Sequence, residues 1–230
     1  MEQIAARVQD IRARIDAACS AAGRPAGSVE LLPVSKTRPA SSVLAAYAAG
    51  CRRFGENKAQ EARAKAIELA GTPELEWVMI GHLQSNKAKL VAEFASGFQG
   101  LDSLPLAAEL DRRLQAAGRQ LDVLIQVNSS GEDSKFGLPP AEVVGFASAL
   151  APFDALRVRG LMTLALPSPD VAQVAACFDR VLDVQRHLRD AAAPGQSYDE
   201  LSMGMSGDFE LAIAHGATVV RIGTAIFGPR

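Results

Sequence analysis

The feature that most constrains the fold of this 230-residue chain is a regular alternation of short apolar runs with helical segments. Runs of this length and composition are typical of buried strands. The eight expected strands cover residues 29–35, 52–55, 76–81, 97–103, 121–128, 157–164, 200–204 and 218–223. The expected helices between them cover residues 40–49, 57–70, 86–95, 105–117, 140–150, 169–192 and 208–215. Strands and helices that alternate in this way form right-handed βαβ units around a parallel sheet.

Eight such units in about 200 residues predict an α/β fold of the TIM (β/α)8 barrel class. The alternative is an open doubly wound sheet, but no G-x-G-x-x-G pattern follows an early strand. Residues 3–22 carry apolar side chains at helical spacing before the first strand, so we expect an extra helix packed outside the barrel or across one end. We expect a single domain over residues 1–230, with the N-terminal helix within 1–25 and the barrel over 29–228.

Composition excludes several classes of function. The formal net charge is −2, which does not favour a nucleic-acid surface or a basic membrane anchor. We find neither a signal peptide nor an apolar run long enough to span a membrane, so we expect a cytoplasmic protein. Cys19, Cys51 and Cys177 are far apart and form no metal-binding pattern, which indicates reduced thiols and no metal site.

A lysine stands at the end of the first expected strand, in the segment VELLPVSKTRPA. Functional side chains of such barrels lie at the carboxyl ends of the strands. Lys36 at this place has two possible states. Its ammonium group either reaches water and keeps its charge, or it is buried and loses its proton, because burial disfavours the charged form and lowers the pKa of an amine. A neutral amine forms a Schiff base with an aldehyde or ketone, which an arginine cannot do. Lys36 is therefore a candidate for covalent attachment of a ligand.

The loops after the last two strands indicate a phosphate site. Ser206 precedes a short helix, and Gly223 and Thr224 follow the last strand. Barrels of this class often bind phosphate with the loops after strands seven and eight. The structural alternative is that Ser206 and Asp208 only cap the helix and that Gly223 only forms a tight turn.

Arg221 alternates with apolar residues in the segment VVRIG and is expected to point into the barrel. A buried guanidinium group requires an acceptor. That acceptor is either a carboxylate, such as Asp208 or Glu210, or a ring nitrogen of a ligand. The sequence does not decide between a carboxylate and a ligand nitrogen as the acceptor.

Four segments together resemble the pyridoxal phosphate homeostasis protein family: PVSKTRP, FGENKAQEA, WVMIGHLQSNK and LSMGMSGDFELAIAHGATVVRIGTAIFG. They occur in the same order and extend over about residues 29–228. The resemblance implies a barrel like the N-terminal domain of alanine racemase, with pyridoxal 5′-phosphate (PLP) bound as a Schiff base. It implies roles for eight residues: Lys36 as the Schiff-base lysine, Ser206, Gly223 and Thr224 around the phosphate, Arg221 at the pyridine nitrogen, and Asn57, His82 and Met203 around the ring.

The resemblance also implies a function. An arginine stays cationic, so a pyridine nitrogen that faces Arg221 stays unprotonated and the ring stabilises a carbanion poorly. Racemisation needs a second base opposite the lysine. Tyr47 and Tyr198 are expected away from the barrel mouth, and His82 is either that base or a wall or hydrogen-bond partner in the pocket. We therefore expect a monomeric protein that binds PLP and contributes to its intracellular homeostasis without strong catalysis. Transfer of PLP to PLP-dependent apo-enzymes is left open.

Two other functions remain as alternatives. One is a monomeric PLP-dependent amino-acid racemase. The other disregards the resemblance: a mouth lysine with a phosphate site also suits a Schiff-base aldolase that acts on sugar phosphates. Lys135, in the loop 131–137 after the fifth strand, is either a solvated charge or a contact for an anion or a transient second aldehyde.

Overall fold

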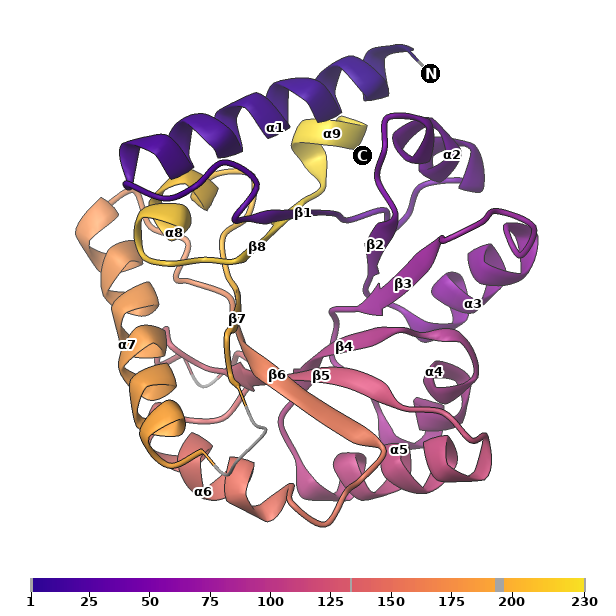
Figure 1. The fold of residues 1–230 in the computed structure, drawn as a ribbon, viewed down its shortest axis with the longest axis vertical. Coiled ribbons are helices and arrows are strands. Elements are labelled where there is room, and N and C mark those ends of the chain that lie inside the picture. The colour runs from indigo at the N-terminus through magenta and orange to yellow at the C-terminus, as the bar shows by residue number, and fades with distance from the viewer. Residues whose placement is uncertain (1, 133, 193–196, 230) are drawn as a thin grey trace.

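Eight parallel strands form a barrel with helices on its outside (Figure 1). The computed structural model describes residues 2–132, 134–192 and 197–229. Hydrogen bonds join the strands in the order β1-β8-β7-β6-β5-β4-β3-β2, and a bridge between Val34 and Gly55 brings β1 beside β2. The strands are β1 Glu30–Pro33, β2 Arg53–Glu56, β3 Glu76–Met79, β4 Gly97–Leu101, β5 Leu121–Val127, β6 Leu156–Thr163, β7 Glu200–Ser202 and β8 Val219–Ile222. The predicted TIM barrel is confirmed.

The helices follow the strands as expected, with one addition. They are α1 Glu2–Ala21, α2 Ala40–Ala48, α3 Ala59–Glu68, α4 Ala88–Phe94, α5 Leu104–Ala116, α6 Val143–Ala149, α7 Val171–Asp190, α8 Phe209–Ala214 and α9 Thr224–Phe227. Short 3-10 turns, η1 Ser85–Lys87 and η2 Pro140–Glu142, precede α4 and α6. The sequence did not predict α9, because four residues are too few to show a helical period.

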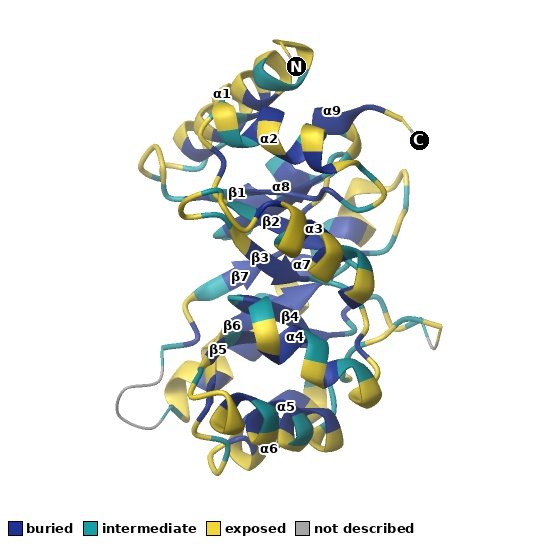
Figure 2. Cartoon of the chain, turned by 90° about the vertical axis from the view of Figure 1, so that its right-hand side faces the viewer, coloured by how far each residue is buried: buried dark blue, intermediate teal, exposed yellow. Residues whose placement is uncertain are grey.

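The core has two parts. A large cluster of apolar side chains fills the space between the strands and the helices, and a small cluster of Leu32, Val78 and Val219 lies apart from it. Val219 and Arg221 alternate with Val220 and Ile222, which belong to the large cluster, so Val219 and Arg221 face the barrel interior. Buried residues follow the strands through the middle of the molecule (Figure 2). Strands covered on both faces explain the continuous apolar runs in the sequence.

The extra N-terminal helix lies outside the barrel, where α1 contacts α2, α8 and α9 (Figure 1). Its buried side chains, Val8, Ile11, Ile15 and Cys19, lie three or four residues apart and form one face. Among the described residues, no helix is long and apolar enough to cross a membrane. The single-domain organisation over residues 1–230 stays a prediction.

Candidate functional site

The loop of Lys36 and the loops of the proposed phosphate residues start from three neighbouring strands. The amide of Val34 donates to the carbonyl of Ile222 over 2.9 Å, and the amide of Arg221 donates to the carbonyl of Gly204 over 3.0 Å. Lys36 comes two residues after Val34, and Gly223 comes directly after Ile222. The ends of β1, β8 and β7 are therefore adjacent, and the loops that carry residues 36, 203–206 and 223–224 start from the same edge of the barrel.

The backbone near residues 206 and 224 has space beside it. A Cβ atom added at Gly207 would meet no described atom within 4 Å. One added at Gly223 would meet only Val34, at 3.4 Å, which is ordinary contact. Neither glycine has a positive φ, so the surrounding protein does not require glycine at these positions. A ligand that approaches the backbone closely would require it.

Arg221 is bound inside the barrel, as predicted from its position. Its Nη1 donates to the Ser202 hydroxyl and its Nη2 to the Thr163 carbonyl, both over 2.7 Å. The Ser202 hydroxyl in turn donates to Gln99 over 2.7 Å. Burial lowers the pKa of Arg221 to about 10, against the attraction of Asp208, so the guanidinium group keeps its charge at neutral pH. The hydrogen bonds of Arg221 thus go to a hydroxyl and a carbonyl rather than to a carboxylate.

The carboxylates that were considered as acceptors for Arg221 have other partners. Glu210 pairs with Arg14 of α1. Asp208 accepts the amide of Met205 over 2.6 Å, and burial raises its pKa. Asp208 is the N-cap residue of α8 but makes no side-chain cap bond, and Ser206 is half-buried before it.

The other three predicted ring-pocket residues lie in different environments. Asn57 is half-buried after β2, and an added Cβ at Gly81 would lie 2.5 Å from its carbonyl oxygen, so the loops after β2 and β3 touch. His82 is exposed and stacks on Phe136, with ring centroids 3.9 Å apart and planes 9° apart. Met203 is buried in the large hydrophobic cluster. The roles of these residues around a cofactor ring stay predictions.

A buried ionic network flanks Lys36, and the sequence did not reveal it. Lys65 of α3 is 6% exposed and uses all three donors of its ammonium group. Nζ donates to the Ser35 carbonyl over 2.7 Å, to Glu56 over 2.6 Å and to Glu61 over 2.9 Å. The Ser35 hydroxyl donates to the same Glu56 oxygen over 2.7 Å.

The network also reaches the residue after Lys36. The backbone amide of Thr37 donates to the carboxylate of Glu61. Thr37 has a φ of 63°, in the left-handed region that a β-branched residue rarely adopts. One signal for this network is visible in the sequence: Lys65 lies three residues after Ala62, on the face of α3 that Ala59 and Ala62 bury. A lysine on a buried helix face needs acceptors.

Hydrogen bonds join the loop after β5 to the segments that follow β4 and β6. Lys135 donates to the carbonyl of Ala165 over 3.2 Å and pairs with Glu132. The amide of Gly137 donates to Asp102 over 3.3 Å. Burial raises the pKa of Asp102, while the nearby His82 opposes that rise. Lys135 is therefore a paired residue of the loop rather than a solvated charge.

The remaining candidates bond within the scaffold. The Tyr47 hydroxyl donates to the carbonyl of Pro73 over 3.1 Å, and Tyr198 is buried just before β7, at the amino end of the barrel. His215 lies 2.7 Å from Asp179. The three cysteines are buried and free. In the described part of the chain, no three His, Cys, Asp or Glu residues are grouped so that they could bind a metal ion.

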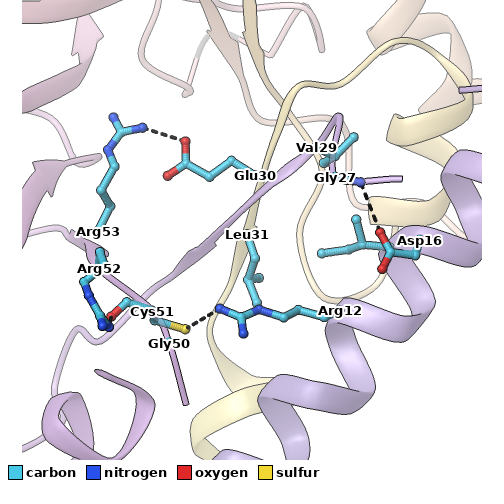
Figure 3. A pocket seen from close by; sticks show the side chains of 11 residues that line it. Arg12, Asp16, Gly27, Val29, Glu30, Leu31, Gly50, Cys51, Arg52 and Arg53 are labelled. Carbon is cyan, nitrogen blue, oxygen red and sulfur yellow. Dashed lines mark hydrogen bonds and ion pairs between the residues drawn. The ribbon is translucent and has the colours of Figure 1, made fainter. Parts of the chain in front are cut away.

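A cleft of about 400 Å³ lies at the opposite, amino end of the barrel, between α1 and the starts of β1 and β2 (Figure 3). Its arginines are already bound. Arg12 donates to the Ala49 carbonyl over 2.8 Å, and Arg53 pairs with Glu30 over 2.5 Å. The cleft therefore offers no unpaired cation to a ligand and lies away from Lys36.

Comparison with known proteins first defines the class of the barrel. Residues 7–230 match the family model described as alanine racemase, N-terminal domain. The alanine racemase of Clostridium difficile has the same fold, with a TM-score of 0.77 at 13% identity, over all of this chain and 57% of that one.

Closer relatives define the family. The pyridoxal phosphate homeostasis proteins of Pseudomonas aeruginosa and Escherichia coli K12 are 44% and 43% identical to this chain; each match covers all of this chain, and 97% and 98% of the relative. PipY of Synechococcus elongatus, solved with PLP bound, has a TM-score of 0.85 at 37% identity, over 98% of this chain and 100% of that one. The chain belongs to the pyridoxal phosphate homeostasis protein family.

Proposed function

We propose that this protein binds PLP covalently through Lys36 and contributes to PLP homeostasis in the cell. The observation that carries the proposal is the junction of β1, β8 and β7, which brings the Lys36 turn beside the loops of Ser206 and Gly223. Homologues named for PLP homeostasis, and a PLP-bound relative of the same fold, support it.

The residues at this end of the barrel fit the functional groups of PLP. When bound, PLP supplies an aldehyde with which a lysine amine condenses, and one water is lost. Lys36 is the candidate amine, and the hydroxyls of Ser206 and Thr224 are candidate donors to the phosphate. The charged guanidinium group of Arg221 suits an unprotonated pyridine nitrogen. Asn57, His82 and Met203 are proposed to surround the ring.

The position of the tyrosines favours a carrier over a racemase. Racemisation requires a second base across the ligand from the lysine. The Tyr47 hydroxyl is bound to Pro73 on the outside of the barrel, and Tyr198 lies at its amino end. We therefore propose a carrier of PLP. We further propose, without a contact among the described residues that bears on it, that PLP-dependent apo-enzymes receive PLP from this protein and that it acts as a monomer.

Reduction with borohydride followed by peptide mass mapping tests the proposal. Hydride adds to the C=N bond, so a pyridoxyl-phosphate adduct is expected on the peptide that contains Lys36. Lys36→Ala should give no adduct, whereas Lys135→Ala should keep it and so serves as the control at the same mouth. An adduct on another lysine, or none on the wild-type protein, would refute the assignment.

A second measurement separates the carrier from the racemase. The loaded protein is incubated with each proteinogenic amino acid in deuterium oxide. A carrier should leave the Cα hydrogen unexchanged in every case. Exchange that depends on Lys36 would favour the racemase instead.

A further inference from the structure

The turn that carries Lys36 is held from both sides by a single buried cation. Lys65 binds the carbonyl of Ser35 directly, over 2.7 Å. It also binds Glu61, which accepts the amide of Thr37. The residues before and after Lys36 are thus tied to the same ammonium group of α3.

Stability alone does not explain why this buried ionic network is present. Glu56 is fully buried and Lys65 is 6% exposed, and burying two charges costs more than packing apolar side chains of the same volume. One oxygen of Glu56, Oε2, is buried and has no hydrogen-bond partner among the described residues. Burial raises the pKa of Glu56, although bonds from Lys65 and Ser35 oppose this.

Backbone strain occurs at the same place. Thr37 adopts a left-handed φ of 63°, and such residues persist only where the surroundings hold them. The bond from its amide to Glu61 is one of those restraints. Buried charge and backbone strain therefore both occur next to the proposed attachment residue.

We propose that Lys65 is a positioning residue for Lys36, which fixes the turn from Ser35 to Thr37 and so the direction in which the Lys36 side chain leaves β1. The inference rests on the proposed function, because it assumes that Lys36 bonds to PLP. A lysine side chain is long and flexible, so a fixed starting direction reduces the conformational entropy lost when its amine reaches the aldehyde.

The test compares two ligands that differ only at the reacting group. Pyridoxine 5′-phosphate has the ring and phosphate of PLP but an alcohol in place of the aldehyde. In Lys65→Met, the dissociation constant of PLP should rise about tenfold, because bond formation at Lys36 depends on its placement. That of pyridoxine 5′-phosphate should change less than about twofold, since ring and phosphate contacts lie elsewhere. Lys89→Met, at an exposed lysine of α4, is the control and should change neither.

A double variant separates positioning from stability. Lys65→Met alone leaves Glu56 without its cation, so the variant is expected to lose thermal stability. Glu56→Gln combined with Lys65→Met removes both charges of the buried pair and leaves only the partly exposed Glu61 charged, so it should recover much of that stability. The carbonyl of Ser35 still lacks its donor, so the selective loss of PLP affinity should remain. Recovery of PLP affinity together with stability would overturn the proposal.

Two other results would also overturn the inference: equal weakening of both ligands in Lys65→Met, or PLP binding equal to that of the wild type. Failure of the proposed function has a different signature. If borohydride traps no adduct on Lys36 of the wild-type protein, the covalent site itself is wrong. If the wild type is trapped on Lys36 and Lys65→Met is trapped to the same extent at subsaturating PLP, only the positioning role is wrong.

Discussion

The two ends of the barrel both carry charged side chains, but they expose them differently. At the amino end, Arg53 pairs with Glu30, and the two side chains are 29% and 34% exposed. At the carboxyl end, Glu56 is fully buried, and Arg221 and Lys65 are 4% and 6% exposed. Water screens the first group of charges, whereas the second is desolvated and depends on its hydrogen bonds.

This difference supports the proposed position of the functional site at the carboxyl end of the barrel. Partly exposed ion pairs contribute little, so the amino-end pairs need no explanation beyond solubility and modest stabilisation. The buried charges lower stability unless every bond is kept, and they occur around the strand ends where barrels of this class bind ligands. We therefore do not propose the cleft at the amino end as the functional site (Figure 3).

Among the three substitutions that compare the two ends, the largest effect on folding is expected at the carboxyl end, for Ser202→Ala. The Ser202 hydroxyl accepts from Arg221 and donates to Gln99, and its loss leaves both without that partner inside the barrel. We expect the free energy of unfolding to fall by about 2 to 3 kcal/mol, because one of the groups left unpaired is charged. Urea denaturation measures this change in the free energy of unfolding. Ser148→Ala, at an exposed serine of α6, should change it by less than about 0.5 kcal/mol. If Ser202→Ala and Ser148→Ala lowered the free energy of unfolding equally, the distinction between buried and exposed polar groups would be wrong.

A smaller effect is expected at the amino end, for Arg53→Met. The variant loses the pair with Glu30 and the longer contact of 3.5 Å with Glu76. Since these groups are partly exposed, the free energy of unfolding should fall by about 1 kcal/mol. The difference from the wild type should shrink in 1 M salt, where ion pairs are screened over about 3 Å. PLP affinity should not change; a loss of PLP binding would show that the two ends are coupled.

The smallest effect concerns the pH dependence of stability, through Glu200→Gln at the amino end. Burial raises the pKa of Glu200, so the folded state binds its proton more tightly than the unfolded state does. This contribution to stability is therefore present at low pH and is lost as pH rises from about 4, the unfolded pKa, through the raised folded pKa. Glutamine does not titrate, so the variant should gain stability relative to the wild type between pH 4 and pH 7, by less than about 1 kcal/mol. Thermal unfolding at several pH values measures the gain, and a relative loss would contradict the assigned direction.

Much of the fold was predictable because its signals are local. Strands buried on both faces give apolar runs, and α1 has its apolar residues on one face. Arg221 was correctly expected to point inward, because side chains alternate along a strand. The helix α9 was missed because four residues carry too little pattern.

The partners of these residues were not predictable. From the sequence, Arg221 was expected to meet a carboxylate or a ligand; in the structure its guanidinium group donates to the Ser202 hydroxyl of β7 and the Thr163 carbonyl of β6. Lys65 bonds to Ser35, thirty residues away in the chain. No periodicity relates residues at such separations.

The sequence by itself determined the number and order of the strands, the order of the helices other than α9, the lysine at the end of the first strand and the family to which the chain belongs, since each depends on neighbouring residues or on short motifs. Only the tertiary structure decided which charged groups share one buried network beside Lys36 and which stay in contact with water. The closed barrel decides which charged groups are buried together, because it brings together strand ends and helices that are far apart along the chain.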